Sequence, residues 1–371
     1  MNIENYKKDI DACRFCFMCR HVCSVARVTH EEEMTPRVRG LLLSMVLRKA
    51  TDYTEEISEK IYQCTLCKYC KEWCEGGWDL PSAIIAARFD LVKKGLVPEV
   101  VKNVKESLIK FDNAYNQEGP ISTDLQEVVS QYITPAKTLL LFGSSVLYLS
   151  PEIGLSAVNI FKKGKVDFMV LKREAASANE LYNLGYIKEA KEKALTLLEK
   201  IKTSDCQEVV TLSGSLYYLL TEGITKMELE VGNLRVYHIT GFLLKLISEG
   251  KIELKKTLNK KLTYHESDYL ARYSKLHDEP RKLIKQIEGV DYVELRWNRG
   301  KARSIGSALI KNTYPDLATK LLKTRLDEVI KTGVDTLIIS SGEDKSSFIN
   351  STDKPSSLQI IDIVELIDEL S

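Results

Sequence analysis

Cysteine is the most unevenly placed residue type in this chain of 371 residues. Eight of the nine cysteines lie between Cys13 and Cys74, and only Cys206 lies beyond them. The eight form two quartets with identical Cys-x-x-Cys-x-x-Cys-x-x-x-Cys spacing, namely Cys13, Cys16, Cys19 and Cys23, then Cys64, Cys67, Cys70 and Cys74. In a reducing compartment such crowding indicates thiolate ligands to metal rather than disulfides.

The spacing of the quartets predicts two [4Fe-4S] clusters. Three thiolates at intervals of three residues let one loop surround three corners of a cubane, and the fourth cysteine, on a following helix, reaches a more distant iron. In two-cluster ferredoxins this fourth ligand crosses to the other cluster. We therefore expect one cluster to be held by Cys13, Cys16, Cys19 and Cys74, and the other by Cys64, Cys67, Cys70 and Cys23.

Structural zinc is the competing interpretation of the quartets. Zinc sites also use Cys-x-x-Cys, but usually as two pairs separated by a longer finger, which argues against zinc here. The proline that commonly follows the last cysteine is replaced by Ser24 and Glu75, a change that removes no ligand. Lys68 and Lys71 lie beside the cysteines, where positive charge would raise a cluster's potential or only aid solubility.

The elements around the cysteines are predicted to be helices. Thr35 followed by Pro36 is typical of a helix start, and a second helix is expected from about Pro81 until Gly95 ends it. We therefore predict a mostly α-helical ferredoxin domain over residues 1–110. The turn-rich residues 111–134 are expected to form a linker.

Beyond Pro135 short apolar strands alternate with charged helices, which is typical of α/β layering. An internal repeat runs through this part. GKVDFMVL at 164–171 corresponds to GVDYVEL at 289–295, and VVTLSGS at 209–215 corresponds to LIISSGE at 337–343. The predicted fold is multi-domain α plus α/β, with two related α/β halves at 135–233 and 234–371 after the helical domain.

Composition excludes several classes of function. A net charge of only +1 argues against a dedicated nucleic-acid surface. The opening residues, MNIENYKKDI, lack the apolar core of a secretory signal, and no apolar run approaches the roughly 18 residues of a membrane span. We expect a cytoplasmic protein that meets the inner face of a membrane only peripherally or through a partner.

At this point the sequence resembles a known family, that of the heterodisulfide reductase catalytic subunit. It also resembles the iron-sulfur subunits of anaerobic glycerol-3-phosphate dehydrogenase and of glycolate or lactate oxidase. The likeness covers nearly the whole chain and rests on both quartets and on four further motifs: TPRVRG at 35–40, KKGLVPE at 93–99, LTYHESDYLARY at 262–273, and VDTLIISSGE at 334–343.

The resemblance also implies cysteine-rich motifs in both α/β halves, and these are degenerate here. By local alignment the cysteines of that family are replaced by Ser144, Ala175, Ala176, Ser213 and Leu216 in the first half, and by Asp268, Ser304, Ile305, Ser341 and Asp344 in the second. Reducing a disulfide at a special iron-sulfur centre needs thiolates, and Cys206 alone cannot supply them.

We therefore predict an electron-transfer subunit without catalytic residues of its own. By resemblance, it would take electrons from a flavin-containing dehydrogenase of the glycerol-3-phosphate or 2-hydroxy acid type and pass them toward a quinone or another carrier. Two alternatives stay open. One is a heterodisulfide reductase-like subunit acting on a disulfide or small substrate, and the other is an adaptor that holds redox subunits together.

Overall fold

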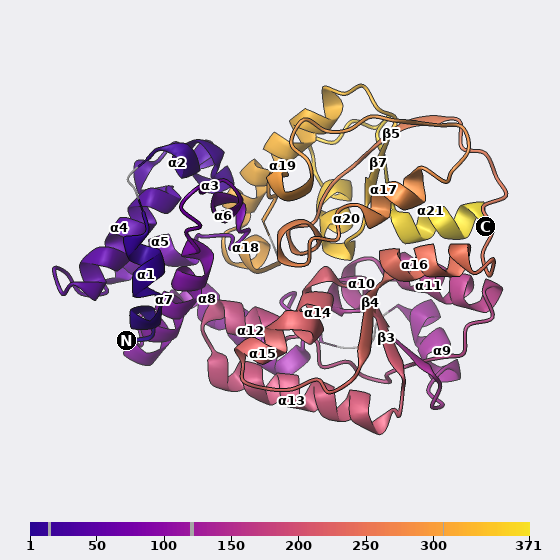
Figure 1. Ribbon diagram of the computed structural model, residues 1–371, viewed down its shortest axis with the longest axis horizontal. Coiled ribbons are helices and arrows are strands. Elements are labelled where there is room, and N and C mark those ends of the chain that lie inside the picture. The colour runs from indigo at the N-terminus through magenta and orange to yellow at the C-terminus, as the bar shows by residue number, and fades with distance from the viewer. Residues whose placement is uncertain (14–15, 119–121, 307) are drawn as a thin grey trace.

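The computed structural model describes residues 1–13, 16–118, 122–306 and 308–371. Figure 1 shows three parts: a helical module formed by the first third of the chain, and two α/β parts that lie beside it, one above the other in this view. No helix among the described residues is long and apolar enough to cross a bilayer.

The amino-terminal module is built from short helices whose ends follow from local sequence. The Thr35 side chain accepts a hydrogen bond from the Val38 amide and Pro36 opens the helix, as predicted. Asp79 caps the longest helix by accepting from the Ser82 amide, and Gly95 ends it with a φ of 71°. The elements are η1 (Asn2–Tyr6), α1 (Lys7–Asp11), α2 (Met18–Val22), α3 (Ser24–Thr29), η2 (Glu32–Met34), α4 (Pro36–Leu47), α5 (Glu55–Tyr62), α6 (Tyr69–Glu72), α7 (Leu80–Lys94) and α8 (Glu99–Phe111).

The first α/β part contains a four-stranded parallel sheet in the order β2-β1-β3-β4. All four residues of β1 and of β3 are buried, as expected for central strands that helices cover on both faces. The elements are α9 (Thr123–Gln131), β1 (Thr138–Leu141), α10 (Ser144–Leu149), α11 (Pro151–Lys163), β2 (Phe168–Val170), α12 (Ala178–Leu184), α13 (Ile187–Thr203), β3 (Glu208–Thr211), α14 (Gly214–Tyr218), η3 (Leu219–Gly223), α15 (Ile224–Lys226), β4 (Arg235–His238) and α16 (Ile239–Ser248).

The second α/β part has the same kind of sheet, parallel and in the order β6-β5-β7-β8. When the strands of each sheet are numbered along the chain, both sheets have the order second, first, third, fourth. The elements are β5 (Lys260–Tyr264), η4 (Tyr269–Tyr273), α17 (Glu279–Ile284), β6 (Val290–Tyr292), η5 (Arg299–Lys301), α18 (Ala308–Thr313), α19 (Pro315–Ile330), β7 (Thr336–Ile339), α20 (Gly342–Ile349), β8 (Gln359–Asp362) and α21 (Ile363–Leu370).

Two segments differ from the sequence prediction. The stretch 111–134 carries α9, because Ser122 caps it and Leu125 and Val129 pack into the apolar core of the first sheet. The first sheet also continues past residue 233, where the first half was expected to end, since β4 pairs with β3 from Arg235 onward. The sequence did not indicate α9 or β4, because both segments are short and polar. Tertiary packing, rather than a local pattern, stabilises them.

The two α/β parts pack directly on one another. α11 contacts α21 and α10 contacts α20, and Figure 1 shows α21 between the two sheets. The Ser150 hydroxyl of the first part donates to the Gly342 carbonyl of the second at 2.9 Å. This packing brings the loops after β3 and β7 toward a common interface, beside the helical module.

Candidate metal centre

Each cysteine quartet lies in the same local structure. A helix ends just before the first cysteine, and a short helix carries the third: Cys19 lies in α2 and Cys70 in α6. In the second loop Leu66 and Lys68 adopt left-handed backbone angles, with φ of 56° and 59°, which lets the chain turn between Cys64 and Cys70. Arg14 and Phe15, within the first loop, lie outside the described residues.

The two quartets lie against each other. Helix α2 contacts α6, so that the buried residues Cys19 and Cys70 come from neighbouring helices. A Cβ placed on Gly76 would lie 3.5 Å from the Ala12 carbonyl oxygen and 3.7 Å from the Cys74 Sγ. The fourth cysteine of the second quartet is therefore close to the residue that precedes Cys13.

The pKa values of the buried thiols also indicate that the two quartets lie close together. Burial raises the pKa of Cys19 to about 12, and the further causes are the nearby thiols of Cys13, Cys16, Cys23 and Cys74. Burial also raises the pKa of Cys70, with Cys67, Cys64, Cys23 and Cys19 as the next causes. Each quartet thus lies within electrostatic reach of the other's fourth cysteine.

Crowded, desolvated thiols of this kind suit iron-sulfur ligation. Without a cation they resist ionisation, whereas coordination to iron stabilises the thiolates directly. Within the described ranges no three His, Cys, Asp or Glu side chains form a site for one metal ion. In a cubane each thiolate binds a different iron, so the fit of the quartets rests on their order and proximity.

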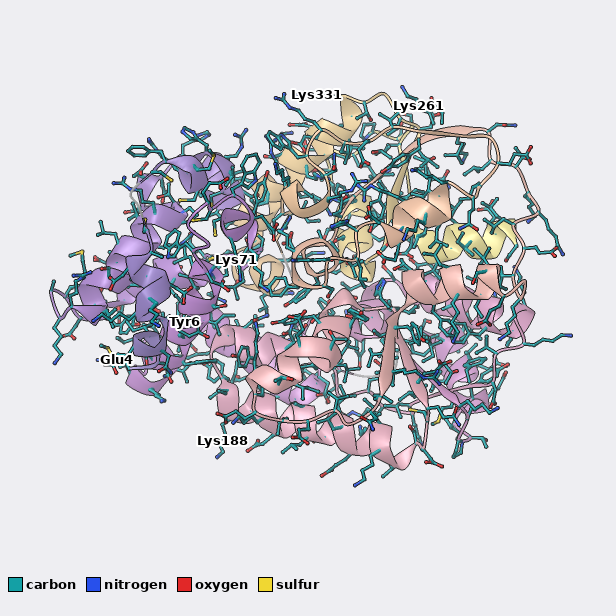
Figure 2. The ribbon with its side chains drawn as sticks, viewed as in Figure 1. Glu4, Tyr6, Lys71, Lys188, Lys261 and Lys331 are labelled. Atoms are coloured by element: carbon teal, nitrogen blue, oxygen red, sulfur yellow. The ribbon has the colours of Figure 1, made fainter. Side chains whose placement is uncertain are left out.

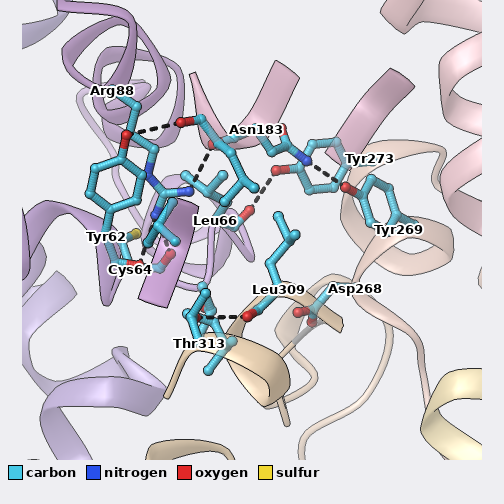
Figure 3. A pocket seen from close by; sticks show the side chains of 14 residues that line it. Tyr62, Cys64, Leu66, Arg88, Asn183, Asp268, Tyr269, Tyr273, Leu309 and Thr313 are labelled. Carbon is cyan, nitrogen blue, oxygen red and sulfur yellow. Dashed lines mark hydrogen bonds between the residues drawn. The ribbon is translucent and has the colours of Figure 1, made fainter. Parts of the chain in front are cut away.

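Buried side chains hold the loop that carries Cys64 and Cys67, and Figure 3 shows Arg88 and Tyr273 beside Cys64 and Leu66 of this loop. Arg88, on α7, donates to the carbonyls of Cys64 at 2.8 Å and Asn183 at 2.8 Å. From the second α/β part, the Tyr273 hydroxyl donates to the Leu66 carbonyl at 2.5 Å, and the Arg272 Nε donates to the Cys67 carbonyl. All three parts of the molecule therefore hold this loop.

Positive side chains at the second quartet have definite partners. Lys71 pairs with Asp79 at 2.5 Å, and Figure 2 places it on the side of the helical module that faces the α/β parts. The Lys68 ammonium lies 3.6 Å from the centre of the Tyr273 ring, and burial lowers its pKa to about 8.

Four of the ten positions where the resemblance implies cysteines meet in one cavity of about 60 Å³. It lies where the loops after β3 and β7 approach each other, and its walls include Ser213, Asp268, Ser341 and Asp344. The Asp268 carboxylate accepts hydrogen bonds from Arg272 and Ser304. This cavity is thus lined by hydroxyl and carboxyl groups. Cys206 stands apart, between α13 and β3.

Sequence reasoning missed the arginines around the quartets. Arg39 and Arg88 are 1% and 2% exposed, and both donate to main-chain carbonyls next to the cysteine loops. The sequence does contain a sign of their burial, since Arg88 interrupts the apolar face of α7 and Arg39 lies in the TPRVRG motif. A lone arginine in a helix does not by itself reveal that it will be buried.

Comparisons with known proteins agree with this geometry. The family model of the 4Fe-4S dicluster domain matches residues 9–78, which contain both quartets. A subunit of the dihydromethanophenazine:CoB–CoM heterodisulfide reductase of Methanosarcina mazei is 23% identical over 383 residues, which cover 97% of this chain and 94% of that protein. Lactate utilization protein A 1 of Bacillus mycoides is 27% identical over 208 residues, which cover 54% of this chain and 82% of that protein.

One solved structure shares the fold across the whole chain. A hypothetical protein from Helicobacter pylori matches with a TM-score of 0.55 and 9% identity, over 100% of this chain and 76% of that protein. Residues 9–78 therefore match a 4Fe-4S dicluster domain, and the chain is similar along nearly its full length to the heterodisulfide reductase subunit of Methanosarcina mazei.

Proposed function

We propose that this protein is an electron-transfer subunit that carries two [4Fe-4S] clusters and relays electrons within an oxidoreductase complex. The observation that carries the proposal is the contact between two cysteine quartets of identical spacing. When bound, such clusters supply one-electron transfer. The protein's own residues hold the ligands in place, shield Cys19 and Cys70 from water, and fix the distance between the two sites.

The crossed assignment of ligands is part of the proposal. One cluster is held by Cys13, Cys16, Cys19 and Cys74, and the other by Cys64, Cys67, Cys70 and Cys23. The position of the Cys74 Sγ near the Ala12 carbonyl supports the first set. The influence of Cys64 on the pKa of Cys23, whose largest cause is burial, supports the second.

The two α/β parts are proposed to be related halves that shield and dock the helical module. The repeated segments support this, because GKVDFMVL contains β2 and GVDYVEL contains β6, while VVTLSGS and LIISSGE begin in β3 and β7. The equal strand orders give further support. The loss of cysteines from their shared cavity argues against cluster chemistry in these halves.

The proposed partner is a flavoprotein dehydrogenase, of the glycerol-3-phosphate or 2-hydroxy acid type, with a quinone or another carrier as acceptor. Support comes from the names of the relatives, one a reductase subunit and one a lactate utilization protein. The adaptor function is a second candidate, favoured by the extensive contact between the halves and the helical module.

The test is an anaerobic redox titration of the full-length, cluster-loaded protein, followed by electron paramagnetic resonance. The proposal predicts two reversible one-electron signals, of which Cys67→Ser perturbs one and Cys16→Ser the other. The control is Cys206→Ser, which should leave both signals unchanged. If Cys67→Ser abolishes electron flow but the complex with the copurifying flavoprotein still assembles, relay and docking are separate roles. If no signal titrates, the relay is wrong.

A further inference from the structure

Two buried arginines of the helical module, Arg39 and Arg88, donate their hydrogen bonds mainly to main-chain carbonyls. The hydrogen bonds of Arg88 go to the carbonyls of Ile61, Tyr62, Cys64 and Asn183, at 2.8 to 3.1 Å. Arg39 donates to the Lys60 carbonyl at 2.8 Å and to the Met34 carbonyl at 2.6 Å. Among the ion pairs of the described residues, none includes either arginine, although the other deeply buried arginines, Arg272, Arg281 and Arg325, all have a carboxylate.

An unpaired guanidinium in the interior is costly unless a negative group compensates it. Main-chain carbonyls satisfy hydrogen bonds but carry no net charge. A buried, permanently charged arginine therefore needs a counter-ion nearby. The Cys64 thiol lies within electrostatic reach of Arg88, and the Cys23 thiol within reach of Arg39.

Each arginine lies near a cysteine of a different quartet, Arg88 near Cys64 of the second and Arg39 near Cys23 of the first. Arg88 reaches the Cys64 carbonyl, as Figure 3 shows, and Cys64 is the charged group with the largest influence on it after burial. Arg39 shares the Met34 carbonyl with Cys23, whose Sγ lies 3.9 Å from that oxygen. Under the crossed assignment, Cys23 and Cys64 are ligands of the same cluster.

We propose that Arg39 and Arg88 are the buried counter-ions of the cluster held by Cys23, Cys64, Cys67 and Cys70, and that they raise its reduction potential. The inference rests on the proposed function. A four-thiolate [4Fe-4S] cluster becomes more negative on reduction, and fixed positive charge in a desolvated site favours the more negative state. The two arginines are positioning and tuning residues, because they act through the ligands and their loops.

Among the described residues, no buried arginine of this kind adjoins the cluster proposed to be held by Cys13, Cys16, Cys19 and Cys74. Cys16 is exposed, and the groups that follow burial in raising the pKa of Cys19 are all thiols. Solvent therefore reaches this site at Cys16. The arginines should thus act on one cluster and leave the other nearly unaffected.

The test is a redox titration of the anaerobic, cluster-loaded full chain, with Arg39→Gln, Arg39→Lys, Arg88→Gln and Arg88→Lys. The Cys67→Ser variant identifies the signal of the Cys64 cluster. We expect both glutamine variants to move the midpoint potential of that same signal to more negative values. The lysine variants should stay close to the parent, because lysine keeps the charge while it changes the hydrogen bonds. Arg235→Gln, which removes a 61% exposed guanidinium on β4, is the control and should shift neither signal.

Each other outcome is decisive. If both clusters are present and the glutamine variants leave the potential of the Cys64 cluster unchanged, the inference is wrong. It is also wrong if the two variants shift different clusters, or if lysine and glutamine act alike. If a glutamine variant fails to hold a cluster, the lost signal must be that of the Cys64 cluster, and lysine must restore it. A parent protein without two clusters would instead overturn the proposed function.

Discussion

Glu174 is a buried carboxyl group in the loop after β2, beside the end of β1. Its two oxygens accept hydrogen bonds from the amides of Phe142 and Gly143, at 2.6 and 2.8 Å. Burial nevertheless raises its pKa from an ordinary 4.5 to about 7. The folded chain therefore binds a proton more tightly than the unfolded chain, and stability from this group is lost as the pH rises from about 4.5 to 7.

The prediction concerns Glu174→Gln, which cannot titrate. Relative to the parent, the variant should lose less stability between pH 5 and 7.5, by up to about 3 kcal/mol for a difference of this size. Thermal unfolding at several pH values measures this, and the raised pKa of Asp362 acts equally in both proteins. A constant gap between the two proteins across this range would refute the assignment.

At the scale of single residues, the sequence was enough to propose the cysteine ligands, whereas the side chains that hold their loops could not be predicted from it. A cluster motif is local, because one loop supplies three ligands at fixed intervals. The contacts of Arg88 with Asn183, or of Tyr273 with Leu66, join residues far apart in the sequence. Nothing in the sequence near Arg88 indicates which loop its guanidinium reaches.

At the scale of elements, Trp78, which precedes α7, can pack closely on α4 because residue 40 of α4 is a glycine. A Cβ on Gly40 would lie 2.7 Å from the Cη2 atom of Trp78, which is 1% exposed and just precedes α7. Gly40→Ala should therefore destabilise the helical module by about 1–3 kcal/mol, despite the better helix propensity of alanine.

Gly241, on α16, is the matched control because a Cβ there meets nothing within 4 Å. Gly241→Ala should stabilise the chain by up to about 1 kcal/mol. Chemical unfolding of both variants gives the two signs. Equal effects at the two positions would show that the Trp78 contact does not limit the packing of α4.

The helix boundaries that the sequence predicted correctly are those with local signals. Thr35 with Pro36 and the glycine at residue 95 fix their helix ends through caps that need no tertiary partner. Helix α9 and strand β4 were missed because their burial comes from the rest of the fold. Leu125 packs with the core of the first sheet, and β4 exists through its pairing with β3.

At the scale of the whole molecule, tyrosines join the helical module to the α/β parts. The Tyr62 hydroxyl donates to the Leu184 carbonyl at 2.9 Å, and the Tyr273 hydroxyl donates to the Leu66 carbonyl in the Cys64 loop. Tyr62→Phe or Tyr273→Phe should each lower stability by about 1–2 kcal/mol, since a buried carbonyl loses its partner. Both should also hasten loss of iron to a chelator.

Tyr292→Phe is the control that distinguishes a general loss of stability from a weaker contact between the helical module and the α/β parts. The Tyr292 hydroxyl donates to Glu294 at 3.0 Å within the second α/β part, away from the cysteine loops. We expect it to lower stability without hastening iron loss. If all three variants release iron at the same rate, the tyrosine contacts do not protect the centre.

The most direct measurement is the iron and acid-labile sulfide content of the anaerobic full-length protein, together with its resonance spectrum after complete reduction. Two adjacent cubanes predict equal iron and sulfide, about four of each per cluster, and a spectrum broadened by magnetic coupling between neighbouring centres. Replacing one ligand, as in Cys16→Ser, should perturb the signal of that cluster and leave the signal of the other cluster in place. Bound zinc without sulfide, or two uncoupled signals, would contradict the account.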